Sequence, residues 1–157
     1  MSAEPEPVGF ALATRLAASP DAVWERVASF EGINHELGPW LRMTAPRGTE
    51  LTPEAVPLGR RWFRSWLLLG GVLPVDYDDL TVWRVEPGRG FHERGALGSV
   101  KVWEHERTLE PVPGGTLVVD RLALVPRVPG TARVALAIVR LVFRWRHHRL
   151  AEHFGRL

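Results

Sequence analysis

The chain has 157 residues and a formal net charge of +2, with no cysteine and with seven tryptophans against one tyrosine. This length fits one domain, which can bury roughly 70% of the surface of its unfolded form. Without cysteine there is no disulfide framework, thiolate zinc site or catalytic thiol, and the cytoplasm is the default compartment. Residues 1–7 are rich in Pro and Glu and lack the apolar run of a signal peptide, so we expect a disordered tail followed by a single domain over 8–157.

The first part of the chain predicts one strand and two short helices. From Val8 to Leu16, apolar residues alternate with small or polar ones, which is the period of a half-buried strand. Ser19, Pro20 and Asp21 then supply an N-cap, a proline at the first helical position and an early acid, so we expect a helix over 20–29. Residues 33–43 favour a second short helix or a turn-rich segment, and residues 44–57 a loop.

The second part predicts a meander of strands and then one long helix. Strand-length runs over 60–68, 75–85, 90–96, 100–109 and 116–125 are separated by short turns rich in Gly and Pro, which is typical of antiparallel hairpins. Residues 131–154 combine an apolar stripe, which we expect the sheet to cover, with a solvated basic face. The stripe holds Val134, Ile138, Leu141, Val142 and Trp145, and the other face Arg133, Arg140, Arg144 and His147. The arginines interrupt this run before the ~20 apolar residues that a membrane span needs.

Several short segments mark this order of elements, namely 19–24, Gly59, 103–107, 114–116, Asp120 with Arg121, and 143–150. Together they resemble the SRPBCC or START-like superfamily, which includes polyketide cyclases, lipid-transfer domains and Bet v 1-like plant proteins. The resemblance covers about Phe10 to Phe154. It implies an α+β helix-grip fold, in which a curved antiparallel sheet of about six to seven strands wraps around a long C-terminal helix and an internal cavity, with two short helices after strand one. It does not imply a reaction, because one scaffold hosts enzymes, carriers and sensors. Segment 143–150 looks like the terminal helix of a bacterial, ligand-binding branch of this superfamily.

The strand around Trp103 carries the main catalytic candidate. Alternation places Trp103, His105 and Arg107 on one face of this strand. If that face lines the cavity, His105 could donate to a ligand oxygen or transfer a proton, because the pKa of histidine lies near neutrality. The alternative is a structural histidine that is hydrogen-bonded inside the barrel. We predict no other catalytic residue.

Acids that point inward need partners. Glu93 and Asp120 on neighbouring strands would be costly to bury unpaired, so we expect structural ion pairs with Arg146 or Arg149 of the last helix. The alternative is that one of these groups anchors the carboxylate or carbonyl of a ligand.

Large aromatic rings can line a cavity as well as fill a core. The positions of the tryptophans in the sequence do not decide between the two roles. The residues predicted to contact a ligand are Trp62, Trp66, Trp83, Trp103, His105, Ile138, Val142 and Trp145.

We predict no metal site and no cofactor. The run Asp76 to Asp79 lacks the glycine and the distal glutamate of a calcium loop, and we interpret it as a solvated strand end. His148 and Glu152 stand four residues apart, but no third ligand follows at a recognisable spacing.

Three functions stay open at this point. The first is binding, transport or sensing of a small hydrophobic or aromatic molecule in a cavity between the sheet and the C-terminal helix. The second is an enzyme of the polyketide cyclase or aromatase kind, in which His105 or a buried acid assists enolisation or dehydration. The third is a regulatory interaction module with a collapsed cavity. We expect no nucleic-acid partner, no membrane insertion, and a monomer or homodimer.

Overall fold

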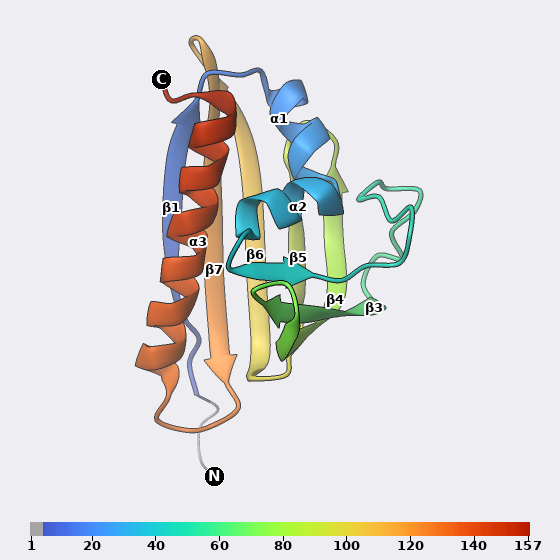
Figure 1. Ribbon diagram of the computed structural model, residues 1–157, viewed down its shortest axis with the longest axis vertical. Coiled ribbons are helices and arrows are strands. Elements are labelled where there is room, and N and C mark those ends of the chain that lie inside the picture. The colour runs from blue at the N-terminus through green and yellow to red at the C-terminus, as the bar shows by residue number, and fades with distance from the viewer. Residues whose placement is uncertain (1–4) are drawn as a thin grey trace.

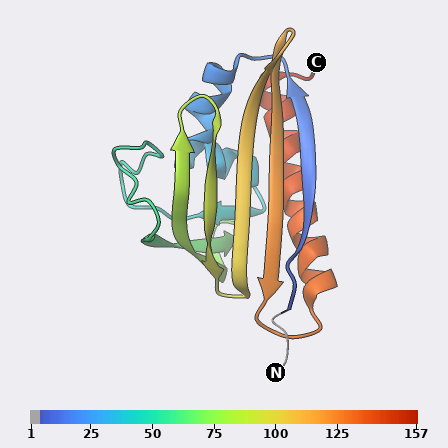
Figure 2. The same cartoon turned by 180° about the vertical axis from the view of Figure 1, so that it is seen from behind.

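The computed structural model describes residues 5–157, and in this range three helices lie on one face of a seven-stranded antiparallel sheet (Figure 1). Figure 2, seen from behind, shows the opposite face of the sheet with its strands in front of the helices. Residues 1–4 of the expected tail lie outside the described range. In chain order the elements are β1 (Val8–Leu16), α1 (Pro20–Val27), α2 (Phe30–Leu37), β2 (Leu41–Met43), β3 (Arg61–Leu69), β4 (Leu73–Glu86), β5 (Gly90–Leu97), β6 (Val100–Val112), β7 (Gly115–Pro126) and α3 (Ala132–Phe154).

The strand order is β1-β7-β6-β5-β4-β3-β2, so the first strand of the chain pairs with the last. β1 and β7 pair in continuous register from Val8↔Leu124 to Leu16↔Thr116. Register shifts interrupt the pairs β3–β4, β4–β5 and β6–β7, and such bulges bend and twist a sheet. The α+β helix-grip fold expected from the sequence is confirmed.

The two short helices begin at serine caps. The Ser19 side chain accepts a hydrogen bond from the Ala22 backbone N–H at 3.2 Å, and the Ser29 side chain accepts one from the Gly32 N–H at 3.0 Å. Each cap satisfies one of the N–H groups that a helix leaves unpaired at its start. These caps start α1 and α2, and they position α2 beside α3 over the sheet (Figure 1).

The segment after α2 differs from the expectation. We predicted a helix or turn-rich segment over 33–43, but Leu41–Met43 forms the short edge strand β2. Its partners are Leu67–Leu69 of β3. This pairing is made with a distant part of the chain, so the local pattern before it carries no signal.

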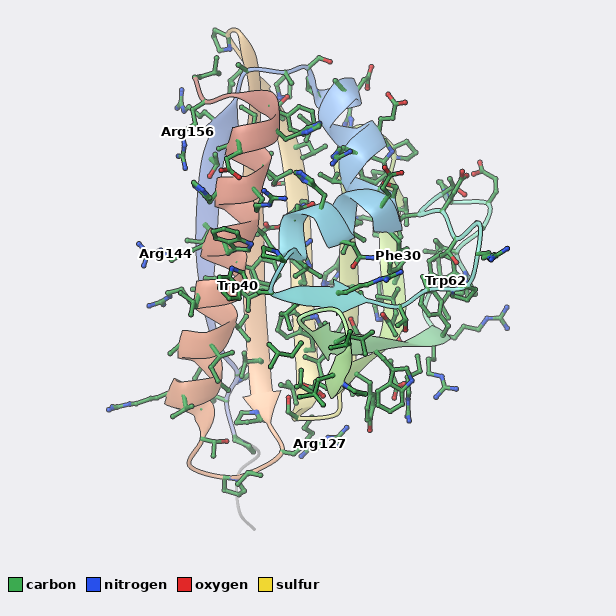
Figure 3. The ribbon with its side chains drawn as sticks, viewed as in Figure 1. Phe30, Trp40, Trp62, Arg127, Arg144 and Arg156 are labelled. Atoms are coloured by element: carbon green, nitrogen blue, oxygen red, sulfur yellow. The ribbon has the colours of Figure 1, made fainter. Side chains whose placement is uncertain are left out.

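The first half of α3 also differs from the expectation. Val134, Ile138 and Leu141 are more than half exposed, although we expected the sheet to cover them. His147, assigned to the polar face, is buried instead. The cause is that the first half of α3 packs on the core through another face, with Ala135, Leu136 and Val139, and that the fully buried residues of α3 all lie in its second half. Arg144 projects away from the sheet, in agreement with a solvated basic face (Figure 3).

Candidate functional site

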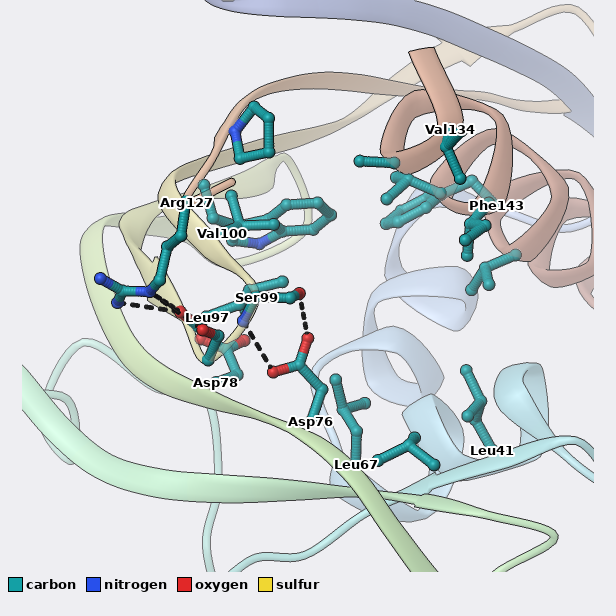
Figure 4. A pocket seen from close by; sticks show the side chains of 18 of the residues that line it. Leu41, Leu67, Asp76, Asp78, Leu97, Ser99, Val100, Arg127, Val134 and Phe143 are labelled. Carbon is teal, nitrogen blue, oxygen red and sulfur yellow. Dashed lines mark hydrogen bonds between the residues drawn. The ribbon is translucent and has the colours of Figure 1, made fainter. Parts of the chain in front are cut away.

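An apolar cavity of about 710 Å³ lies between the first half of α3 and the strands (Figure 4). Sites for small molecules commonly measure about 300 to 1,000 Å³. The cavity is partly open to solvent, and α2, β2, β3, β4, β5, β6 and α3 all contribute to its walls. Its main apolar side chains are Leu37, Leu41, Met43, Leu67, Val75, Leu97, Val100, Trp103, Val128, Val134, Ile138, Val139, Val142 and Phe143.

Most polar groups at the cavity already have protein partners. Asp76 accepts hydrogen bonds from the Ser99 hydroxyl and from the Ser99 backbone N–H, the latter at 3.1 Å (Figure 4). Arg127 donates from Nε to the Gly98 carbonyl at 2.9 Å and from Nη2 to the Leu97 carbonyl at 3.1 Å. Both contacts hold the β5–β6 turn at one end of the cavity.

Asp78 is the exception among these groups. It is only 5% exposed and lies in the cavity lining, yet within residues 5–157 no hydrogen bond or ion pair reaches its carboxyl group. Burial raises the pKa of Asp78 well above its ordinary value of 3.8, and the neighbouring acids Glu93, Asp79 and Asp76 raise it further. The surroundings of Asp78 therefore disfavour the charged carboxylate relative to a carboxylate in water.

The position of Asp78 corrects our interpretation of residues 76–79 as a solvated strand end. In the middle of β4 the buried side chains are Asp78, Leu80 and Val82, which alternate with less buried ones. This is the period of a half-buried strand, so Asp78 occupies an inward position that would otherwise suit an aliphatic residue. Asp79 points outward and pairs with Arg64 through two hydrogen bonds of 2.8 and 3.2 Å.

A second polar cluster lies under the second half of α3, with Asp120 at its centre. Asp120 is fully buried and accepts four hydrogen bonds. Oδ1 accepts from Arg107 Nε at 2.8 Å and from His105 Nε2 at 2.7 Å, while Oδ2 accepts from Arg107 Nη2 and from His147 Nε2, both at 2.7 Å. Burial acts to raise the pKa of Asp120, but Arg107 and His105 outweigh it and hold this pKa well below 3.8. Asp120 is thus an ionised carboxylate whose acceptor sites are filled.

Arg107 joins this carboxylate to the helices. Its Nη1 donates to both oxygens of Glu36 in α2, at 2.9 and 3.1 Å, and Arg146 Nε of α3 donates to the same Glu36 at 3.1 Å. Glu36 and Arg107 are fully buried, and Arg146 is nearly so. A further contact joins His147 Nδ1 to the Thr14 hydroxyl of β1 at 2.8 Å, so the cluster ties α2 and α3 to β1, β6 and β7.

His105 is held between two acids. Its Nε2 lies 2.7 Å from Asp120 Oδ1 and its Nδ1 lies 3.2 Å from Glu93 Oε1. Burial acts to lower the pKa of His105, but Asp120 and Glu93 outweigh it and leave this pKa raised. Both nitrogens then donate to carboxylates, which is the arrangement of an imidazolium in a structural role and leaves no free nitrogen for a substrate.

The profile of the family described as "Domain of unknown function (DUF8410)" matches residues 14–154. The chain belongs to this family. No curated protein matches the sequence of this DUF8410 protein.

Solved structures share the fold of the DUF8410 chain. A Chromobacterium violaceum protein has a TM-score of 0.70 at 13% identity, over 98% of this chain and 100% of the other. A START superfamily protein from Mycobacterium smegmatis has a TM-score of 0.65 at 13% identity, over 96% and 97%. DynU16, a protein of the dynemicin biosynthetic locus, has a TM-score of 0.61 at 18% identity, over 98% of this chain and 51% of the other. At these identities the likeness shows the fold, which is that of the START-like superfamily.

The cavity of the DUF8410 protein brings together only some of the residues predicted to contact a ligand. Trp103, Ile138 and Val142 line it, whereas His105 borders a separate space of about 50 Å³. Glu93 and Arg146 border both spaces.

The other four tryptophans that were predicted to contact a ligand lie outside the cavity lining. Trp66 and Trp83 are largely exposed, and Trp83 donates from Nε1 to the Arg94 carbonyl at 3.0 Å. Trp145 donates to the Gly38 carbonyl at 2.9 Å and so joins α3 to the end of α2. Trp62 packs against Phe63, on the side of the molecule away from α3 (Figure 3).

The predicted ion-pair residues are close together but have other partners than expected. Asp120 pairs with Arg107 of the neighbouring strand, and Arg146 pairs with Glu36, which the sequence analysis did not name. Glu93 accepts from the Trp103 indole N–H and from His105, both at 3.2 Å. Arg149 contacts the His35 carbonyl and Glu152 instead of an inward acid.

Within residues 5–157, no group of three or more His, Asp or Glu side chains is placed to hold a metal ion. None of the helices in this range is long and apolar enough to cross a membrane.

Proposed function

We propose that this protein binds a small, predominantly apolar molecule in the cavity between α3 and the sheet, and that it carries or senses that molecule. The observation that supports the proposal is the cavity itself, about 710 Å³ in volume and walled mainly by aliphatic side chains together with Trp103 and Phe143. A ligand gains roughly 25 cal/mol for each Å² of apolar surface removed from water. Such walls can therefore supply most of the affinity.

The exposed residues at the opening of the cavity also support a ligand. Val134 and Ile138 of α3 and Val75 of β4 line the cavity and are each more than half exposed. Contiguous apolar surface of this kind marks sites where a protein meets another molecule. A ligand in the cavity would remove part of this surface from water.

The two other functions considered from the sequence have less support. In the enzyme alternative, His105 or a buried acid would move a proton, but His105 and Asp120 already use their hydrogen-bonding atoms within the protein. Among the buried acids of residues 5–157, this leaves only the unpaired Asp78 as a candidate for that role. The alternative of a collapsed cavity does not fit a volume of about 710 Å³.

The test fills the cavity and compares the result with a matched surface change. In the double variant Ala135→Trp/Val142→Trp both indoles enter the cavity lining, whereas in Ala137→Trp/Leu141→Trp they lie on the exposed face of the same helix. We expect the first variant to bind the neutral apolar dye Nile red much more weakly than the native protein, and the second to bind it as before. Circular dichroism checks that both fold.

Native mass spectrometry of the protein purified from its own host is the direct complement, because a ligand held in the cavity stays bound and adds its mass. The proposal fails if the dye binds equally well to both double variants, or if the native protein binds no apolar probe.

A further inference from the structure

One buried acid in the cavity lining has no charge or donor to balance it among the described residues. Asp76 has the Ser99 hydroxyl and N–H, and Glu93 has the indole N–H of Trp103 and His105. Asp78, at 5% exposure, has neither a donor nor a cation within residues 5–157. Burying a carboxyl without a donor or a cation destabilises a fold, because the group loses part of its hydration and gains no protein partner in return.

The fold itself gives no reason for an acid at this position. Leu80 and Val82 occupy the next inward positions of β4, and the cavity beside Asp78 is walled by apolar side chains such as Leu97 and Val100. An aliphatic residue would suit the strand better. Binding sites for small molecules combine apolar walls with a few polar groups that bind the polar part of the ligand. An unpaired carboxyl in the lining of an apolar cavity fits that description.

The charges around Asp78 favour one kind of ligand group. The charged neighbours that shift its pKa are all acids, namely Glu93, Asp79 and Asp76. The two guanidinium groups in the lining already have acceptors. Arg146 donates to Glu36, and Arg127 donates to the carbonyls of the β5–β6 turn. Three acids line the cavity against two arginines, and one of these, Arg146, is already paired with Glu36, so the balance of charge favours a cation over a second carboxylate.

We propose that the cavity selects apolar molecules that carry one protonated amine, with Asp78 and Glu93 as the acceptors of the ammonium group. The proposal rests on the proposed function, since it specifies the ligand class of the same cavity. In the complex the carboxylate form of Asp78 accepts a hydrogen bond from the ammonium N–H, and any proton that the carboxyl group carried passes to solvent. The hydrocarbon part of the ligand then lies along the apolar face of α3.

The test uses three probes that share one chain and differ in their polar end, namely decylamine, decanol and decanoate. Isothermal titration calorimetry at neutral pH measures each against the native protein, Asp78→Asn and Asp79→Asn. Asp79→Asn is the matched control, because Asp79 is the next residue of β4 and lies outside the cavity lining. We expect the native protein to bind decylamine at least about tenfold more tightly than decanol, which corresponds to one charge-assisted hydrogen bond. Decanoate should bind most weakly.

Asp78→Asn should remove this preference for the amine and leave decanol binding unchanged. It should also raise the unfolding temperature at neutral pH, since it removes a buried acid, whereas Asp79→Asn should do neither. The inference is overturned if decylamine and decanol bind the native protein equally, or if Asp78→Asn keeps the preference. Those results leave cavity binding intact as long as decanol binds. If none of the three probes binds, cavity binding itself fails, and the inference fails with it.

Discussion

Replacing Asp120 with Asn tests whether the charged cluster under α3 holds the fold together. The substitution keeps the shape of the side chain but removes its charge and turns one acceptor into a donor. Three side chains donate to Asp120 in four hydrogen bonds of 2.7 to 2.8 Å, and Arg107 supplies two of them. In Asp120→Asn at least one of these donors faces an NH₂ group, and Arg107 keeps only Glu36 as a countercharge.

The expected loss is large because every participant is buried. Breaking a buried ion pair by removing one partner costs about 3 to 5 kcal/mol. The whole stability of a domain is about 5 to 15 kcal/mol, so Asp120→Asn should remove a substantial part of it. The cost arises because the guanidinium of Arg107, with no exposed surface, cannot regain water as a partner.

Urea denaturation followed by tryptophan fluorescence measures this loss. Asp79→Asn is the control, because it makes the same change in an acid that also binds an arginine, Arg64, through two hydrogen bonds, but at the surface. Solvent screens that pair, so its loss should be much smaller. Equal losses in the two variants, or a loss below about 1 kcal/mol in Asp120→Asn, would refute the structural role of the cluster.

Three more expectations follow from individual contacts. Because the pKa of His105 is raised in the folded protein, its contribution to stability is present below about pH 6.5 and is lost as pH rises through the folded pKa. Denaturation at about pH 6 and pH 9 should show this loss in the native protein but not in His105→Gln. Gly90 has φ = 147°, and a Cβ there would overlap the Arg107 carbonyl, so Gly90→Ala should lower the unfolding temperature, as a thermal melt would show. Ser19→Ala removes the side-chain cap of α1 and should lower the free energy of unfolding by about 1 kcal/mol, measured by urea denaturation.

Much of the fold could be predicted because its signals are local. Alternation along β1 and β6 gave the correct faces, and Trp103, His105, Arg107 and Leu109 are all buried as that alternation requires. Serine, proline and an acid placed the start of α1 correctly. Edge pairing carries no such signal, which is why Leu41–Met43 was not recognised as a strand.

The candidate site was predicted less well, because it depends on contacts between distant elements. Glu36 can be buried because it forms ion pairs with Arg107 of β6 and Arg146 of α3. The sequence of the short helix α2 does not indicate those partners. Asp78 could have been found, since it continues the inward alternation of Leu80 and Val82. We interpreted it as solvated because it belongs to the acidic run 76–79, and we did not apply the alternation of the strand to it. The tryptophans give no comparable signal, because an exposed ring such as Trp83 and a lining ring such as Trp103 follow the same strand pattern.

The two buried acids Asp120 and Asp78 differ in their surroundings, and we infer that Asp120 serves the stability of the fold while Asp78 serves the selection of the ligand. Asp120 has every acceptor site filled and fixes the second half of α3 to the sheet. Asp78 has no partner within residues 5–157 and lies at the cavity beside the first half of α3, where the helix packs less closely. Replacing the Asp120 carboxylate with an amide should therefore weaken the fold, while the same replacement at Asp78 should strengthen it and change only which ligand is preferred. Opposite signs of the stability change in these two Asp→Asn variants would be difficult to explain if both acids served the fold alone.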